Sequence, residues 1–205
     1  MKNKTQKGFT LIELLVVIAI IAILAVVVVL TLNPAQLLAQ ARDSNRISDF
    51  ATLKSALSLY GTDVSTTTPM NGANLLTTGN GAYALYTGNQ GTSTATSSYN
   101  TSSTWGFLGG ETSVVSTTAR TVNGLGWIPV NLNAISSGAP ISVLPVDPVN
   151  SGSLMYMYAA TTTFFKLATK MESTKYQYNG PNDVVSTDGG NSSTTYEQGS
   201  NLTTL

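Results

Sequence analysis

The chain has 205 residues, a formal net charge of zero, and neither cysteine nor histidine. The missing Cys and His exclude Ser-His-Asp and Cys-His nucleophilic sites, the common zinc sites and disulfides, so we expect no enzyme of those classes. A balanced charge without clustered basic residues gives no indication of specific nucleic-acid binding. The length accommodates one membrane span and one globular domain.

An apolar segment dominates the N-terminal region. Seventeen consecutive apolar residues run from Leu14 to Leu30, within a block from Phe9 to Leu32 that only three polar residues interrupt. As a helix this block would be about 36 Å long, enough to cross a hydrocarbon core of about 30 Å. Residues 1–8 carry three lysines and no acid. The positive-inside rule therefore predicts a cytoplasmic leader, with the chain after Leu32 outside.

Glu13 is the acid inside the predicted span. An ionised carboxylate within a bilayer helix costs roughly 2.5 to 3.5 kcal/mol, so such a residue usually has a partner or a function. Cleavage after Gly8 would free the α-amine of Phe9, which would carry a positive charge. Gly8 suits such a cut, because a residue without a Cβ lets an extended backbone approach a protease. That amine would lie one helical turn from Glu13, or within reach of Glu13 in a neighbouring copy.

The run from Lys7 to Glu13, KGFTLIE, followed by the long apolar helix, resembles the class III signal of type IV prepilins and type II secretion pseudopilins. The resemblance implies that prepilin peptidase cuts after Gly8 and methylates Phe9. It also implies that Glu13 docks each subunit into a filament by pairing with a neighbour's N-terminus. The implied partners are further copies of the chain and a pilus or secretion assembly platform.

Two other interpretations of this segment remain. A secretory signal has a shorter apolar region followed by a small-residue cleavage site, and the first such triplet, Ala39-Gln40-Ala41, lies beyond Pro34. A plain uncleaved anchor would make Glu13 incidental.

After the span, Asn33-Pro34 predicts a break or bend in the helix. Residues 35–60 then predict an amphipathic helix that packs on a sheet and that Gly61 ends. Its apolar stripe consists of Ile47, Phe50, Leu53, Leu57 and Tyr60. The opposite face carries Arg42, Asp43, Arg46, Asp49 and Lys54, with Arg46 and Asp49 spaced for a pair. We expect this face to be solvated, or else to form contacts between filament subunits.

Residues 62–124 are rich in Ser, Thr, Gly and Asn, and ten of the thirteen residues from Thr92 to Thr104 are Ser or Thr. Such composition buries little, which predicts a long irregular connection with at most a short helix near Leu75. From Leu125 the pattern changes to strands and tight turns, beginning with an apolar run to Leu132. Segments 154–160 and 164–171 predict an antiparallel hairpin, with Phe165, Leu167 and Met171 on one side and Lys166 and Lys170 on the other.

The tail from Gly180 contains a candidate calcium site. Asp183 and Asp188, with Asn182, Asn191 and Glu197 nearby, are hard oxygen donors on a Gly-rich backbone. Major pseudopilins carry a calcium loop in this region, and the segment is loosely similar. An ordinary turn accounts for the same residues.

These features predict an α+β, pilin-like fold, in which a long N-terminal helix packs on a small antiparallel sheet. The expected divisions are a leader at 1–8, a membrane and filament-core helix at 9–32, an amphipathic helix at 33–60 and an extracellular head at 61–205. The expected function is that of a pilus-like filament subunit, inserted in the inner membrane before assembly into an extracellular filament. The alternatives are a type II secretion pseudopilin and a membrane-anchored exported enzyme or glycan-binding domain.

Overall fold

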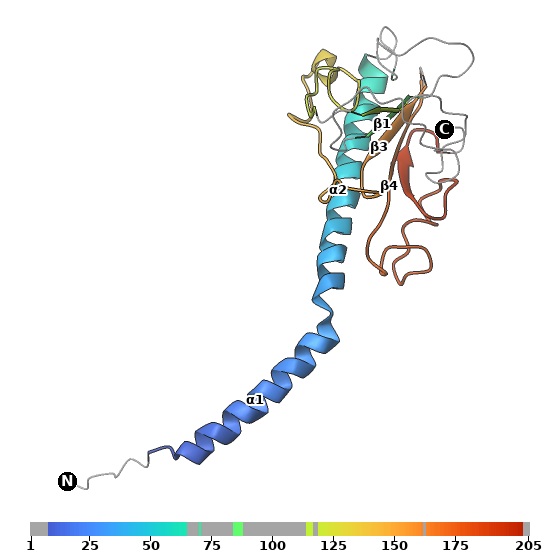
Figure 1. The fold of residues 1–205 in the computed structure, drawn as a ribbon. Helices are drawn as coiled ribbons and strands as arrows, with labels where there is room; N and C mark the ends of the chain where they lie inside the picture. Colours follow the sequence, from blue (N-terminus) through green and yellow to red (C-terminus); the bar gives the residue numbers. More distant parts are fainter. Residues whose placement is uncertain are drawn as a thin grey trace, which may run out of the picture. The chain divides into compact units, whose positions relative to one another are not determined.

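The computed structural model describes residues 8–64, 70, 84–87, 114–116, 119–161 and 163–202. The chain divides into two compact units, Met1–Leu38 and Ala39–Leu205. The first unit holds an apolar helix, and the second combines a helix with a small sheet (Figure 1). The predicted α+β, pilin-like fold is confirmed.

Two helices follow one another at the N-terminal end, α1 (Leu11–Leu32) and α2 (Pro34–Asp63). Asn33 lies between them with a left-handed backbone, φ 42° and ψ 75°, as asparagine tolerates better than most residues. Pro34 opens α2, where its missing N–H would have had no helical partner. The predicted break at Asn33-Pro34 is confirmed.

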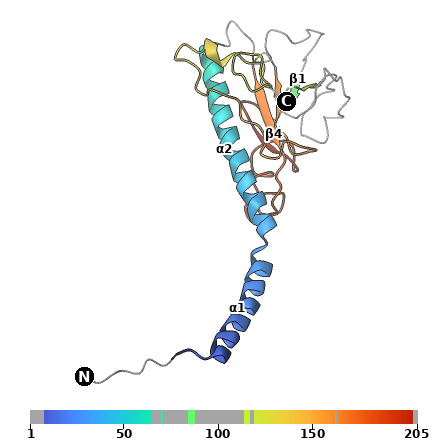
Figure 2. The ribbon, with the colours of Figure 1, turned by 60° about the vertical axis from the view of Figure 1, so that its left-hand side comes forward.

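Helix α2 lies along one face of the sheet and buries the predicted stripe (Figures 1 and 2). Phe50, Leu53, Leu57 and Tyr60 are fully buried. The prediction that Gly61 ends the helix is wrong, because α2 continues to Asp63. A Cβ on Gly61 would lie 2.7 Å from Met70 Cε, so this glycine lets the end of the Met70 side chain approach α2 closely.

The sheet has five described strands in the order β2-β1-β3-β4-β5. Neighbours pair antiparallel except β1 and β2, which are parallel. The predicted hairpin is formed by β3 and β4, with Met157 opposite Ala168 and Ala160 opposite Phe165. The strands are β1 (Ala84–Thr87), β2 (Val114–Ser116), β3 (Met157–Ala160), β4 (Phe165–Thr169) and β5 (Tyr196–Gly199).

Four segments differ from their predictions. Strands β1 and β2 lie in the region expected to be an irregular connection, and β5 lies in the tail. Strands of three or four residues are too short for a clear alternation, and their pairing depends on distant partners. The apolar run from Leu125 to Leu132 forms no strand; it buries Trp127 and Ile128 and leads into the short 3-10 helix η1 (Leu132–Ala134). The helix expected near Leu75 falls outside the described residues.

The main core lies between α2 and the sheet. Phe165, Leu167 and Met171 face it, as predicted, and Phe50 packs edge-on against Tyr156 with ring centroids 5.0 Å apart. The other face of the sheet carries a small apolar cluster of Met155, Met157, Ala159 and Ala168. Both faces of the central hairpin are therefore covered.

Candidate processing and assembly site

The predicted cleavage site precedes the first helix. Gly8, Phe9 and Thr10 are not helical, and α1 begins at Leu11. A Cβ built on Gly8 would meet nothing within 4 Å, and Phe9 is 85% exposed. Among the described residues, therefore, none covers the Gly8–Phe9 peptide bond.

Glu13 folds back onto the start of α1 in a capping box. Its Oε2 accepts hydrogen bonds from Thr10 N at 2.8 Å and Thr10 Oγ1 at 2.7 Å. The Glu13 N–H in turn donates to Thr10 Oγ1 at 3.3 Å. This arrangement satisfies donors that the first helical turn leaves without partners. The carboxylate thus points at the backbone next to Phe9, where cleavage would create the new α-amine.

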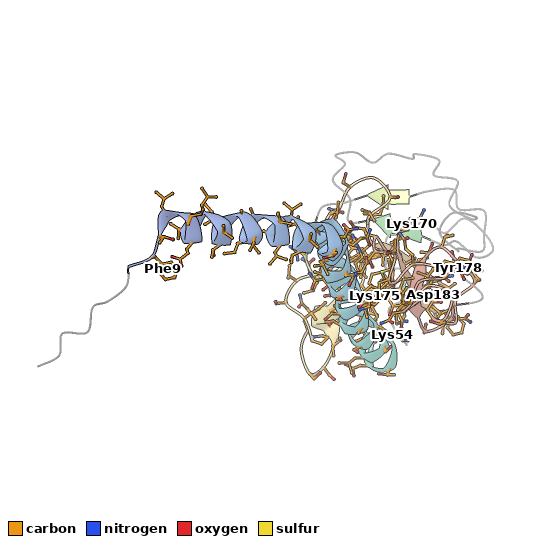
Figure 3. All side chains as sticks on the ribbon, turned by 90° about the horizontal axis from the view of Figure 1, so that it is seen from below. Phe9, Lys54, Lys170, Lys175, Tyr178 and Asp183 are labelled. Carbon is orange, nitrogen blue, oxygen red and sulfur yellow. The ribbon has the colours of Figure 1, made fainter. Side chains whose placement is uncertain are left out.

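Helix α1 is apolar on every side (Figure 3). Every described side chain from Leu11 to Thr31 is exposed, and the segment Leu11–Val29 is long and apolar enough to cross a membrane. A helix that is hydrophobic all round is stable only in a protein core, in a membrane or among other helices. This length and composition fit a membrane anchor.

Residues 3–29 match the family model of the prokaryotic N-terminal methylation motif. The chain carries the prepilin-type motif of type IV pilins and pseudopilins. No curated protein and no solved structure matches the chain.

The prepilin-type motif relates the geometry at the start of α1 to processing of the chain. It implies processing by prepilin peptidase and assembly into a pilus or secretion-system filament, and it indicates a structural, non-enzymatic protein. Together with α1 it fits a precursor anchored in the membrane. Gly8, Phe9 and Glu13 are the residues of the motif to which the sequence assigned roles.

Part of the charged face of α2 is buried inside the head. The expectation that this face is solvated or contacts other filament subunits is corrected accordingly. Asp43 and Arg46 are fully buried. Arg46 donates from Nε to Asp147 Oδ2 at 2.6 Å and from Nη1 to Asp43 Oδ1 at 2.8 Å, and its Nη2 lies 2.6 Å from Glu172 Oε1. We call Arg42, Asp43, Arg46, Asp147 and Glu172 the buried charge network.

The network joins α2 to two distant loops of the head. Arg42 pairs with Glu172 at 2.6 Å, and Asp43 also accepts backbone N–H groups of Glu172 and Ser173. Hydrogen bonds from Arg42 lower the pKa of Glu172, despite its partial burial. Burial by itself would lower the pKa of Arg46, but the hydrogen bonds and charge of Asp147 raise it above its ordinary value. Both shifts favour the charged forms of Glu172 and Arg46 in the folded head.

The remaining charges of α2 also contact the head. Asp49, which the sequence paired with Arg46, instead accepts a hydrogen bond from Tyr156 Oη at 2.7 Å. Lys54 donates to Gln198 Oε1 at 2.8 Å. The charged side of α2 thus holds the helix in the head, beside the apolar stripe.

The two calcium candidates lie in separate hydrogen-bonded turns. Asp183 accepts four bonds within its own loop, because Val185 N and Ser186 N donate to Oδ1 while Asn179 N and Ser186 Oγ donate to Oδ2. These bonds lower the pKa of Asp183 to about 2. Asp188 accepts from Gly190 N and Glu197 N, yet burial raises its pKa to about 6. Among the described residues no three acidic side chains gather as a metal site would require.

Calcium binding at Asp183 and Asp188 remains a prediction from the sequence. The hydrogen bonds that Asp183 already accepts argue against it. A carboxylate has about four lone-pair sites, and donors already occupy those of Asp183. We expect the melting temperature of the purified protein to be the same in calcium as in chelator, and Asp183→Ala to lower it in both. A calcium-dependent rise that Asp183→Ala abolishes, but that the nearby exposed change Tyr178→Ala retains, would instead establish the site.

Lys166 is the functional candidate that the sequence analysis missed. It was expected only on the outer side of the hairpin, yet it is fully buried together with Glu197. Its position on β4 was predictable from strand alternation. Its partner was not, because β5 was not recognised in the tail.

Proposed function

We propose that this protein is a structural subunit of a type IV pilus-like filament. It is made as a prepilin, cut after Gly8, methylated at Phe9 and assembled through α1. One observation carries the proposal: residues 3–29, which match the prepilin-type motif, include most of an apolar helix of which no described side chain is buried.

The physical reason for assembly lies at Glu13. Lipid tails are as apolar as α1, so the helix gains little from apolar contact alone when it leaves the bilayer for a bundle. The acid, in contrast, is costly in lipid and gains a counter-charge from a methylated N-terminus in the filament. Packing of α1 helices and this pairing together favour the polymer.

The proposal also assigns a cellular location to the precursor, its leader and the assembled filament. The precursor is a single-pass protein of the inner (cytoplasmic) membrane with the leader in the cytoplasm, and the polymer is an extracellular filament of many copies built on an assembly platform. A type II secretion pseudopilin is the alternative, and calcium-dependent stability at Asp183 and Asp188 would favour it. Electron microscopy of filaments sheared from cells tests both against an exported enzyme or glycan-binding domain, which would stay monomeric.

Gly8→Val is expected to block processing. A β-branched side chain at the scissile bond obstructs the extended backbone that a protease needs. Folding should be unaffected, since a Cβ on Gly8 meets nothing within 4 Å. Intact-mass analysis should find residues 1–8 retained in the variant and a methylated Phe9 at the start of the wild-type chain.

Thr31→Val is the matched control, because it introduces the same side chain at the other end of α1. The Thr31 hydroxyl donates only within its own helix, to Val27 O and Val28 O, so its loss should leave cleavage normal. A wild-type protein that begins anywhere other than Phe9 would refute the proposed processing.

A further inference from the structure

Lys166 Nζ lies in a buried cluster on the sheet face opposite α2. The amine contacts three oxygens, Glu197 Oε1 at 2.6 Å, Asn191 Oδ1 at 2.8 Å and Leu202 O at 3.1 Å. Lys166 and Glu197 are both fully buried. A primary amine, a carboxamide and a buried carboxyl group therefore meet at one point.

The glycine before Asn191 creates this arrangement. A Cβ on Gly190 would lie on the Glu197 carboxylate, so only glycine allows the loop to pass so closely. Ser192 N donates to Glu197 Oε2 at 3.0 Å, and Gly190 N donates to Asp188 Oδ1 at 2.8 Å. These bonds hold the loop on both sides of Asn191 and keep its carboxamide against the amine.

We propose that Lys166 and Asn191 become joined by an intramolecular amide bond after the head folds. Lys166 Nζ attacks Asn191 Cγ, forming a C–N bond, and the bond from Cγ to Nδ2 breaks. One ammonia molecule leaves, and no oxidant, reductant or other reactant is needed. Lys166 Nζ already donates a hydrogen bond to Asn191 Oδ1, and the carbon that it attacks, Cγ, is bonded to that oxygen. The fold therefore supplies the proximity that such a reaction requires.

Glu197 acts as the catalytic residue of this step. It takes a proton from Lys166 Nζ, which makes the amine nucleophilic, and gives a proton to Nδ2 as ammonia departs. Burial lowers the pKa of Lys166 and raises the pKa of Glu197, in each case against their mutual attraction. Both directions shift the balance from the ion pair toward the neutral amine and the protonated acid.

The amide would link β4 to the loop that precedes β5. It would close a covalent loop between residues 166 and 191 in a chain that has no cysteine for a disulfide. A cross-link of this kind restricts the unfolded chain as a disulfide does, and it is insensitive to reduction. The inference does not depend on filament formation.

Peptide mapping of the full-length protein extracted from membranes tests the proposal. Trypsin should fail to cleave after the acylated Lys166, so segment 121–170 should be recovered covalently joined to segment 176–205, lighter than their sum by one ammonia. Tandem mass spectrometry should locate the link at Lys166 and Asn191. The readout is independent of where the mature chain begins, so its failure is distinguishable from failure of the filament proposal.

Two variants identify the reacting groups. Asn191 is exposed, so Asn191→Ala should fold, lose the linked peptide and melt at a lower temperature. Glu197→Gln removes the proton acceptor at nearly constant size and should likewise abolish or greatly slow the linkage. Asn182→Ala, an exposed change in the same tail, is the control and should retain the linked peptide.

Two outcomes would overturn the proposal. The first is a wild-type protein with separate peptides ending at Lys166 and beginning at Tyr176, which would make the cluster an ion pair only. The second is a loss of ammonia without any linked peptide, since ring closure at an Asn-Gly step such as Asn179-Gly180 gives the same mass change.

Discussion

Glu13→Ala should leave cleavage after Gly8 intact and abolish or severely reduce filaments. An unpaired acid in the bilayer costs roughly 2.5 to 3.5 kcal/mol, and the filament relieves this cost by supplying a counter-charge. Alanine has no such cost to relieve, so the equilibrium constant for adding a subunit to the filament should fall by about a hundredfold. Intact mass measures the cleavage, and electron microscopy of sheared cell surfaces counts the filaments.

Two companion variants separate the charge of Glu13 from its capping role. Thr10→Ala removes the capping-box partner but retains the acid, so it should still assemble. Glu13→Gln keeps the shape and hydrogen-bonding ability of the side chain without the charge, so it should fail as alanine does. Normal filaments from Glu13→Gln would mean that the charge is not what drives docking.

Arg46→Leu should destabilise the folded head by about 3 to 5 kcal/mol, because removing one partner of a buried ion pair leaves the other charge uncompensated. Asp147 Oδ2 would lose its Nε donor, and Asp43 and Glu172 would lose their shared cation. Apolar packing by leucine cannot offset the buried carboxylates of Asp43 and Asp147 left without this cation, whereas Glu172 keeps its pair with Arg42. Chemical denaturation followed by circular dichroism measures the change.

Arg42→Leu is the control for this prediction. Arg42 belongs to the same network and lies one helical turn from Arg46, but its side chain is 33% exposed and pairs with Glu172. Partly exposed pairs contribute about 0 to 1 kcal/mol, so its loss should be small. Equal effects of the two substitutions would show that burial of Arg46 does not set the stability of the head.

The charged residues of α2 show why the sequence predicted a solvated face where the structure has buried ion pairs. Their spacing identified a polar side, and a polar side is usually solvated. Asp147, however, lies 101 residues from Arg46 along the chain, and Glu172 lies 130 residues from Arg42. No local pattern carries that information, and only the fold brings these groups together. The same holds for Lys166, whose partner Glu197 lies on an unrecognised strand.

The sequence by itself determined α1, the site before it, the apolar stripe of α2 and the hairpin of β3 and β4. These features are local, since an unbroken apolar run, a capping pattern or a helical or strand period depends on neighbours along the chain. The tertiary structure alone decided the placement of β1, β2 and β5, the burial of Arg46, and the meeting of Lys166 with Asn191. Those depend on contacts between distant segments, where the cost of burying a charge is offset by a partner that the chain order does not reveal.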